Sequence, residues 1–288
     1  MNRSLVTLVV VAALGPGQAV ARQAGAASSL DDRLVLAARA GNTAAVKQLL
    51  DKGANVEAKS RGEGDAPLLE AVRARHLDTA QVLLEKGANV DDRTGGEDYS
   101  AMELAFGNSD IPMLELLLAH GASIDTRSYH GETALLSAAE GGSLDWMKFA
   151  LAHGADIEAR GYRNETPLVA AAFAGQIEAV KLLLERGAKI EATDDQGATT
   201  LENAAENGDT DVVKLLLDHG ARLEARNRDG QTALMLAAAG DWPVTVQFLL
   251  DRHADLQARD QNGKTALQLA QENGHAGVAK LLMEHGAK

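Results

Sequence analysis

Apolar and polar positions follow one recurring order along most of the chain: two short stretches rich in leucine and alanine, then a polar segment with glycine. The first stretch opens each unit, as in "TALLSAAEGG", and the second closes it, as in "LLERGAKI". The openings recur at a nearly constant interval, at Ala66, Ser100, Thr133, Thr166, Thr199, Thr232 and Thr265. A fixed period of about 33 residues predicts stacked repeats, in which each unit buries its apolar face only against its neighbours.

Two columns of apolar residues recur at this period and predict how the units pack. A single methyl group at the same place in every unit suits closely packed helices, the element that alanine favours. The alanine column is Ala37, Ala71, Ala105, Ala138, Ala171, Ala204, Ala237 and Ala270. Larger side chains fill a second column, which is Leu34, Leu68, Met102, Leu135, Leu168, Leu201, Leu234 and Leu267. We expect both columns to form the core.

Particular residues mark the ends of the predicted helices. The threonine, serine or alanine before each first stretch lies where an N-cap belongs, and Pro67 and Pro167 then occupy a first helical position. Pro112 and Pro243 fall where second helices begin. Left-handed glycines are expected to end the second helices, at Gly53, Gly87, Gly121, Gly154, Gly187, Gly220 and Gly286. His253 replaces this glycine in the seventh unit, at an expected cost of roughly 1 kcal/mol.

These units resemble ankyrin repeats, a family whose unit has a β-turn finger followed by two antiparallel helices. The resemblance rests on T-P-L-type openings and on a later L-L-x-x-G-A, and it covers residues 29–288 in eight units. It implies an all-α repeat solenoid with β-hairpin fingers and terminal caps. The family's usual histidine after T-P-L is missing, which puts in doubt the side-chain bonding of these turns. The first unit lacks a finger and begins with a predicted capping turn from Ser29 to Asp32.

The first residues differ in character from the repeats. Arg3 precedes a ten-residue stretch, Leu5–Leu14, that is apolar apart from Thr7, and residues 19–21 (Ala-Val-Ala) have the small-x-small pattern of a cleavage site. A membrane anchor is the alternative, but a span needs about 20 apolar residues. We therefore predict a signal peptide at 1–21, a short linker at 22–28 and the repeat domain at 29–288. In a bacterium this predicts export to the periplasm, with an extracellular location as the alternative.

Composition narrows the functional classes. The net charge of −13 repels phosphate backbones, so nucleic acid is not an expected partner, and we expect no membrane association of the mature chain. The absence of cysteine excludes disulfides, thiol catalysis and thiolate metal sites. The chain contains none of the H-E-x-x-H, G-x-S-x-G and P-loop signatures, and acid pairs such as Asp91-Asp92 fall in exposed turns. We expect a monomer with no catalytic residues and no cofactor, and an enzyme is the remote alternative.

Four of the eight histidines precede the closing glycine of their units: His120, His153, His219 and His285. Packed units lie about 10 Å apart, too far for two neighbouring imidazoles to bind one zinc ion at about 2.1 Å. We therefore expect no metal site. These side chains are expected to stabilise helix C-termini, where the dipole favours positive charge.

The chain has only three tyrosines, and they fall in the fingers of three consecutive units: Tyr99, Tyr129 and Tyr162. A turn needs glycine and small polar residues, so the rings serve some other purpose. His130 and Arg163 flank them, and Phe173 ends a first helix, a position that faces the concave side in the family that the chain resembles. Exposed tyrosine beside arginine is typical of protein interfaces. We predict a partner-binding site here; in the alternative the rings pack over neighbouring turns.

A basic column also runs through the fingers, interrupted by Thr193: Lys59, Arg93, Arg127, Arg160, Arg226 and Arg259. Acidic residues precede it by two positions: Glu57, Asp91, Asp125, Glu158, Glu191 and Glu224. Residues two apart in extended backbone share a face, so we expect the two columns to neutralise each other across adjacent fingers. Docking of an acidic partner is the alternative. Arg127 and Arg160 lie beside the tyrosines and are counted with the partner-binding site.

The sequence therefore predicts a non-enzymatic protein-binding module that is exported to the periplasm. The resemblance implies that a partner is held against the fingers and concave face of the central units. Such a module would serve as an immunity factor or as an accessory to a periplasmic protein, and the residues do not choose between these roles. The alternative from another class is a secreted effector that acts on host proteins.

Overall fold

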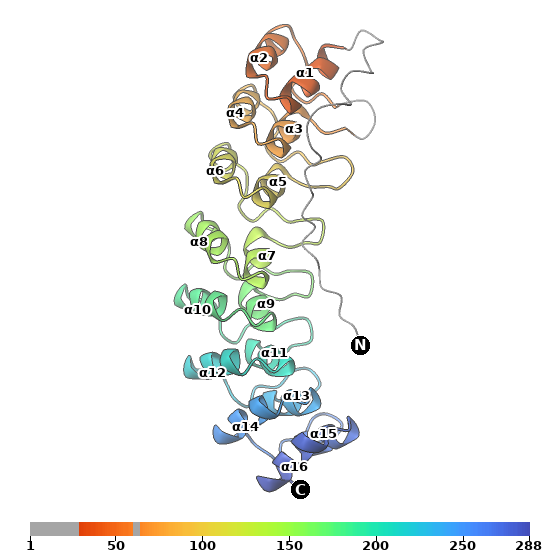
Figure 1. Ribbon diagram of the computed structural model, residues 1–288, viewed down its shortest axis with the longest axis vertical. Helices are drawn as coiled ribbons and strands as arrows, with labels where there is room; N and C mark the ends of the chain where they lie inside the picture. Colours follow the sequence, from red (N-terminus) through yellow and green to blue (C-terminus); the bar gives the residue numbers. More distant parts are fainter. Residues whose placement is uncertain (1–28, 60–63) are drawn as a thin grey trace.

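The computed structural model describes residues 29–59 and 64–288. Within them, sixteen helices pair into eight repeats that stack into a curved rod (Figure 1). The even-numbered helices follow the convex edge, and the loops that precede the odd-numbered helices extend from the opposite side. The expected all-α solenoid is confirmed. The predicted signal peptide at 1–21 and linker at 22–28 lie outside the described residues.

Each repeat consists of an odd-numbered first helix and an even-numbered second helix. The first helices are α1 (Leu30–Arg39), α3 (Pro67–Arg73), α5 (Ala101–Gly107), α7 (Ala134–Glu140), α9 (Pro167–Phe173), α11 (Thr200–Asn207), α13 (Ala233–Ala239) and α15 (Ala266–Glu272). The second helices are α2 (Thr43–Asp51), α4 (Leu77–Glu85), α6 (Ile111–Ala119), α8 (Leu144–Ala152), α10 (Ile177–Glu185), α12 (Thr210–Asp218), α14 (Pro243–Asp251) and α16 (Ala276–Glu284). None of these described helices has the length and apolarity that a membrane span requires.

The helices begin where the sequence predicts. Ser29 and Asp32 form a capping box at α1, so this unit starts with a satisfied N-terminus. The hydroxyl groups of Ser100, Thr133 and Thr166 cap later first helices by accepting a backbone N–H. Ala66 has only a methyl group and forms no such cap. These bonds satisfy amides that an α-helix leaves without an internal partner.

A buried glutamate replaces the missing family histidine in the sixth repeat. Glu202 completes a capping box with Thr199 at α11, and its Oε2 accepts the Thr199 N–H at 2.7 Å. The side chain is fully buried, and burial raises the pKa of Glu202, with hydrogen bonds from Thr199 opposing the rise. Gln268 has the same capping role at α15, where the side chain is exposed, so glutamine can form this capping box.

We predict that Glu202→Gln raises the melting temperature at pH 7.5. The raised pKa means that the folded chain disfavours ionised Glu202 more than the unfolded chain does, so ionisation destabilises the fold at neutral pH. Glutamine keeps the cap without the charge. The difference should shrink as the pH falls through the raised pKa, because Glu202 is then protonated. Thermal melts from pH 7.5 to pH 4 test this, and a variant that melts lower at pH 7.5 contradicts it.

Left-handed residues end the second helices, as expected. Gly53, Gly187 and Gly286 have φ of 89°, 87° and 95°, and the side chain that replaces this glycine, His253, has φ of 65°. A side chain is disfavoured in this region because its Cβ approaches the following carbonyl oxygen. His253 is exposed, so packing contacts of its side chain offset little of this backbone strain.

His253→Gly should raise the melting temperature by about 2–4 °C, since roughly 1 kcal/mol of backbone strain is relieved in a chain of this size. Differential scanning calorimetry measures the shift. His219→Gly is the matched control, because His219 has φ of −94° and gains nothing from glycine. A lower melting temperature for His253→Gly would show that the strain is not present.

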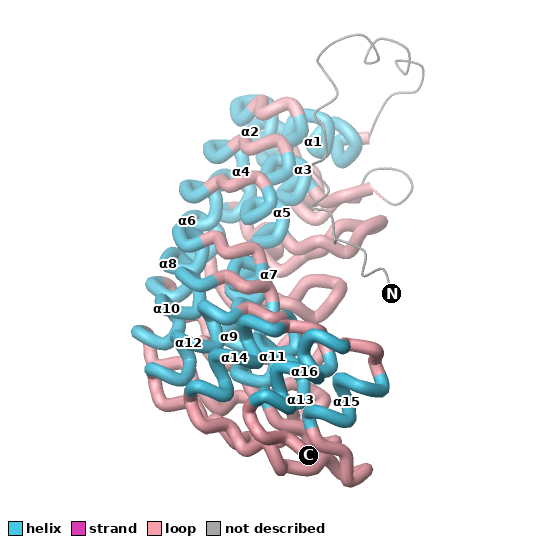
Figure 2. Tube along the Cα trace, turned by 60° about the horizontal axis from the view of Figure 1, so that its bottom comes forward, coloured by secondary structure: helices cyan, strands magenta, loops and turns pink. Residues whose placement is uncertain are grey.

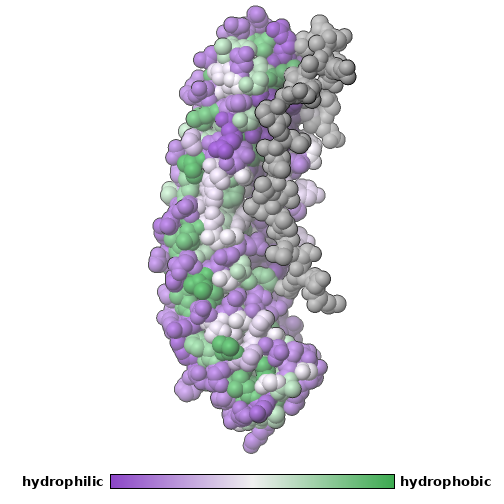
Figure 3. Space-filling model, in the orientation of Figure 1, coloured by the Kyte–Doolittle hydropathy of each residue, from purple (hydrophilic) through white to green (hydrophobic). Residues whose placement is uncertain are grey.

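Both predicted columns form the core, with one exception. Leu34, Leu135 and Leu168 have no exposed surface, and neither do most of the column alanines. Ala37 is only half-buried, because the first repeat has a described neighbour on one side alone. Outside the core, hydrophilic residues cover most of the face in Figure 3, and hydrophobic residues form scattered patches.

The core is divided between the third and fourth repeats. One hydrophobic cluster joins the first three repeats and a second joins the last five. Phe106, Ile124 and Trp146 pack against both clusters but are only half-buried. Helix α7 packs closely on α9 and α3 on α5, whereas the described pair α5 and α7 does not pack in this way, and Figure 1 shows the wider step between them. We call this junction the seam.

The fingers are turns and not β-hairpins, which corrects that part of the predicted fold. Figure 2 shows loops throughout the described finger segments, with isolated bridges at Arg93–Ser100 and Thr193–Thr199. In the fourth finger (residues 120–133) the Ser128 N–H donates to the Glu132 carbonyl at 2.8 Å and the Gly131 N–H closes a tight turn on Ser128. The two sides of such a finger share too few backbone hydrogen bonds to form a pair of β-strands.

Candidate functional site

Four arginines of the basic column fasten their finger to the next one. The Arg127 guanidinium donates from Nη1 to the carbonyls of Gly131, in its own finger, and of Arg160, in the next finger, both at 2.6 Å. Arg160 repeats this with Asn164 at 2.7 Å and Thr193 at 2.5 Å. Arg226 does so as well, further along the array. Charge-assisted bonds of this kind are among the stronger hydrogen bonds in proteins.

The acidic column also bonds to backbone, so the expected neutralisation between the two columns is wrong. Carboxylates of Glu57, Asp125, Glu158 and Glu224 each accept a backbone N–H from the following repeat at 2.7–3.2 Å. Glu191 accepts the backbone N–H and the guanidinium of Arg222. The two columns do not pair, because their side chains bond instead to backbone donors and acceptors of the next repeat. Both columns therefore hold the fingers in place.

The tyrosines lie on these fastened fingers and are open to solvent. Tyr129 is 75% exposed and Tyr162 is 84% exposed, and they occupy equivalent positions in adjacent fingers. Tyr99 is 40% exposed and lies in the part of its finger that leads into α5, just after the positive-φ residue Asp98. The His130 ring meets the Tyr129 ring edge-on, with the ring centroids 5.4 Å apart. Neither Tyr129 nor Tyr162 is packed beneath a neighbouring turn.

The backbone at the two exposed tyrosines is also unusual. At equivalent positions in later fingers, the N–H groups of Asp195, Arg228 and Gln261 each donate to the preceding finger at 2.8–3.0 Å. Among the described residues, the N–H groups of Tyr129 and Tyr162 have no such bond. The fourth and fifth fingers therefore present donors as well as rings.

A small cavity of about 130 Å³ adjoins the fifth finger and brings three predicted residues together. Tyr162, Arg163 and Phe173 line it, and the Arg163 guanidinium lies over the Phe173 ring, 4.9 Å from its centroid. Glu140 and Glu165 belong to its polar wall, together with Glu132, Asp194 and Asn203. Burial raises the pKa of Glu140, and nearby carboxylates add to the rise while Arg163 opposes it.

A larger cavity of about 180 Å³ lies in the seam and was not anticipated from the sequence. Phe106 from α5 and Trp146 and Phe149 from α8 form its aromatic wall. The Trp146 ring centroid lies 4.7 Å from that of Phe106 and 5.8 Å from that of Phe149. Glu132 of the fourth finger lines this cavity and the cavity at Tyr162, so the two are neighbours.

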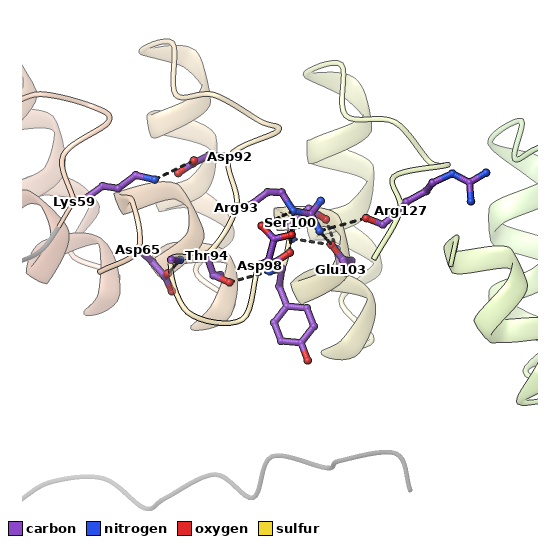
Figure 4. A network of polar contacts seen from close by, with 11 residues as sticks. Lys59, Asp65, Asp92, Arg93, Thr94, Asp98, Ser100, Glu103 and Arg127 are labelled. Atoms are coloured by element: carbon purple, nitrogen blue, oxygen red, sulfur yellow. Dashed lines mark hydrogen bonds and ion pairs between the residues drawn. The ribbon is translucent and has the colours of Figure 1, made fainter. Parts of the chain in front are cut away.

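Glu103 supplies a second carboxylate to the seam cavity and is held rigidly. Its Oε2 accepts the Ser100 N–H at 2.8 Å and pairs with Arg93 at 3.0 Å (Figure 4). Arg93 in turn donates to the Asp98 and Arg127 carbonyls, which ties the third finger to the fourth. The other oxygen, Oε1, is buried and has no hydrogen-bond partner among the described residues.

Three of the four histidines in the column cap their helices. His153, His219 and His285 each donate from Nδ1 to the carbonyl four residues earlier, at 2.8–2.9 Å. No group of three or more histidine or acidic residues within the described part of the chain is placed to hold a metal ion.

The sequence contains a signal for the seam that the repeat pattern conceals. Phe106 stands where the equivalent positions of α7, α9, α11 and α13 hold alanine: Ala139, Ala172, Ala205 and Ala238. Trp146 is likewise larger than its counterparts in later repeats, such as Ala179 and Val212. These large rings lie at the junction where α5 and α7 do not pack closely, and they form part of the cavity wall.

Comparison with known families agrees with this architecture. A family model described as "Ankyrin repeats (3 copies)" matches residues 31–94, 100–194, 150–227 and 201–288. No curated protein matches the chain.

Proposed function

Because the chain belongs to the ankyrin repeat family, we propose that it is a non-enzymatic module that binds a protein partner through its third to fifth repeats. Repeats of this family are usually non-catalytic and suggest protein binding in general terms. The site consists of the exposed side of the third to fifth fingers and the adjoining ends of α5, α7 and α9.

The observation that carries the proposal is the pair of exposed rings on fastened fingers. Tyr129 and Tyr162 are 75% and 84% exposed, while the arginine bonds fix the backbone beneath them. Tyrosine offers a large contact area at low cost in conformational entropy, and a preorganised backbone lowers the cost of binding further. Arg163 and Phe173 extend the surface, Tyr99 and His130 border it, and Arg127 and Arg160 position it.

Affinity capture tests this function. The chain without residues 1–21 serves as bait, as wild type and as the triple variant Tyr99→Ala/Tyr129→Ala/Tyr162→Ala. A matched control removes other exposed apolar side chains away from the site, Leu36→Ala/Val244→Ala/Met283→Ala. We expect a protein that is retained by the wild type and the control and lost by the triple variant. If the folded triple variant retains every partner, the tyrosines are not the site.

We further propose that the protein is exported and acts in the periplasm, as an immunity factor or as an accessory to another protein there. The support is the predicted signal peptide at residues 1–21. A secreted effector acting on host proteins is the second candidate, and it requires another export step. Cell fractionation separates the two, since the first predicts periplasmic protein that lacks residues 1–21 and the second predicts protein in the medium.

A further inference from the structure

The seam cavity has the size of an anchor site for one side chain. Its volume of about 180 Å³ is slightly above that of an engineered cavity that binds benzene, about 150 Å³, and below the roughly 300 Å³ at which drug-sized ligand pockets begin. It lies next to the proposed binding surface, because Glu132 of the fourth finger forms part of its wall. A partner held on the fingers therefore reaches it with a single residue.

The lining of the cavity is apolar and anionic. Aromatic and aliphatic side chains make up most of the wall, and Glu103 and Glu132 are its charged residues, with no lysine, arginine or histidine among them. Aromatic faces attract a cation when water is excluded. The wall therefore suits a side chain that has an apolar stem and a positive tip.

Glu103 makes this preference specific. It lines the cavity, and its Oε2 is held in place by the Ser100 N–H and by Arg93. A charged donor is the strongest hydrogen-bond partner for a carboxylate. The neighbouring cavity adds Glu140, Glu165 and Asp194 against one cation, Arg163, so the net charge outside the anchor site is also negative.

We propose that the seam cavity binds a lysine or arginine side chain presented by a basic segment of the protein partner. The proposal rests on the proposed function, because the partner is the protein held by the central fingers. The stem of the basic residue lies between Phe106, Trp146 and Phe149, and its charged end pairs with the carboxylates of Glu103 and Glu132 in the cavity wall. The protein partner therefore carries a positive surface around this residue.

Trp146 provides a direct measurement of the cavity. The chain has two tryptophans, so Trp242→Phe leaves Trp146 as the single emitter. The probes are peptides Ac-Gly-Ser-Gly-X-Gly-Ser-Gly-NH2 in which X is lysine, arginine, norleucine or glutamate. We expect a saturable change in Trp146 emission with lysine or arginine, and binding about tenfold weaker or worse with norleucine, which has the apolar stem without the charge. Equal binding of the norleucine peptide, or no response to either basic peptide, overturns the proposal.

Substitution of the carboxylate gives an independent test. Glu103→Gln keeps the cap on Ser100 but removes the charge, and it should weaken binding of the basic peptide about tenfold. Glu132→Gln is the second variant in case Glu103→Gln fails to fold, and exposed Glu284→Gln is the control for net charge. Basic peptides that bind the folded cavity variants as tightly as they bind Glu284→Gln overturn the proposal.

The same variants separate this proposal from the proposed function. If Glu103→Gln retains a tyrosine-dependent partner at wild-type affinity, the anchor is wrong and the protein-binding function stands. If no partner depends on the tyrosines but the lysine peptide still titrates Trp146, the preference of the cavity stands and the proposed function fails.

Discussion

Leu68→Ala and Leu168→Ala should destabilise different halves of the array. The two leucines occupy the same column and are both buried, but Leu68 belongs to the cluster of the first three repeats and Leu168 to that of the last five. Removing a buried leucine side chain costs about 2–5 kcal/mol. In a repeat array, stability is approximately a sum of local terms and nearest-neighbour interfaces, so a weak interface at the seam confines the loss to one side.

Hydrogen exchange followed by mass spectrometry measures this directly. Leu68→Ala should accelerate exchange in α3 and leave α9 nearly unchanged, and Leu168→Ala should do the reverse. Urea unfolding of the wild type should show two transitions by circular dichroism, since the two clusters unfold separately. If either variant accelerates exchange equally in α3 and α9, the array is one cooperative unit and the seam is not an energetic boundary.

Single alanine substitutions of the tyrosines should rank by their exposure. Tyr129→Ala and Tyr162→Ala should each weaken partner binding about tenfold or more, because rings of this kind at the centre of an interface are typical hot spots. Tyr99→Ala should have a smaller effect, since this ring is only 40% exposed. Calorimetric titration with the partner recovered by capture measures the affinities.

Melting temperatures of the same variants decide between recognition and packing. Tyr162 is 84% exposed, so its removal should change the melting temperature by no more than an ordinary surface substitution does. If Tyr162→Ala or Tyr129→Ala destabilises the array as strongly as Leu168→Ala, the rings stabilise the fingers and the packing alternative is correct.

Periodicity was sufficient to predict the repeats, the helix ends and most of the core. Each of these depends on short-range chemistry that recurs in every unit: small side chains between helices, hydroxyls at N-caps and left-handed residues after the second helices. His253 shows the strength of this constraint, because it keeps a positive φ of 65° where the other repeats have glycine.

The finger contacts were harder to predict because backbone competes with side chains for partners. The charge pattern suggested that Arg127 and Asp125 belong to mutually neutralising columns, yet both bond to backbone groups of the next repeat. The positions of these backbone groups follow from stacking and are not visible in a list of charges. Exposure of Tyr129 and Tyr162 likewise depends on how adjacent fingers pack.

The seam was not predicted because a repeat pattern is defined by the residues that its units share. Phe106 in a column of alanines and the large Trp146 are deviations from that pattern, and together they accompany the division of the core. The same interruption creates the cavity beside the tyrosines. Phe106 on α5 and Trp146 on α8 depart from the repeat pattern at the same interface, and this coincidence was the signal in the sequence.

Site-specific photo-cross-linking tests most directly whether the central fingers contact the partner. A photoreactive phenylalanine analogue replaces Tyr129 or Tyr162 in one pair of samples, and exposed Val244 or Met283, outside the third to fifth repeats, in the control pair. We expect a cross-linked partner from positions 129 and 162 and none from the control positions. A partner that cross-links from 244 or 283 and not from 129 or 162 contradicts this expectation.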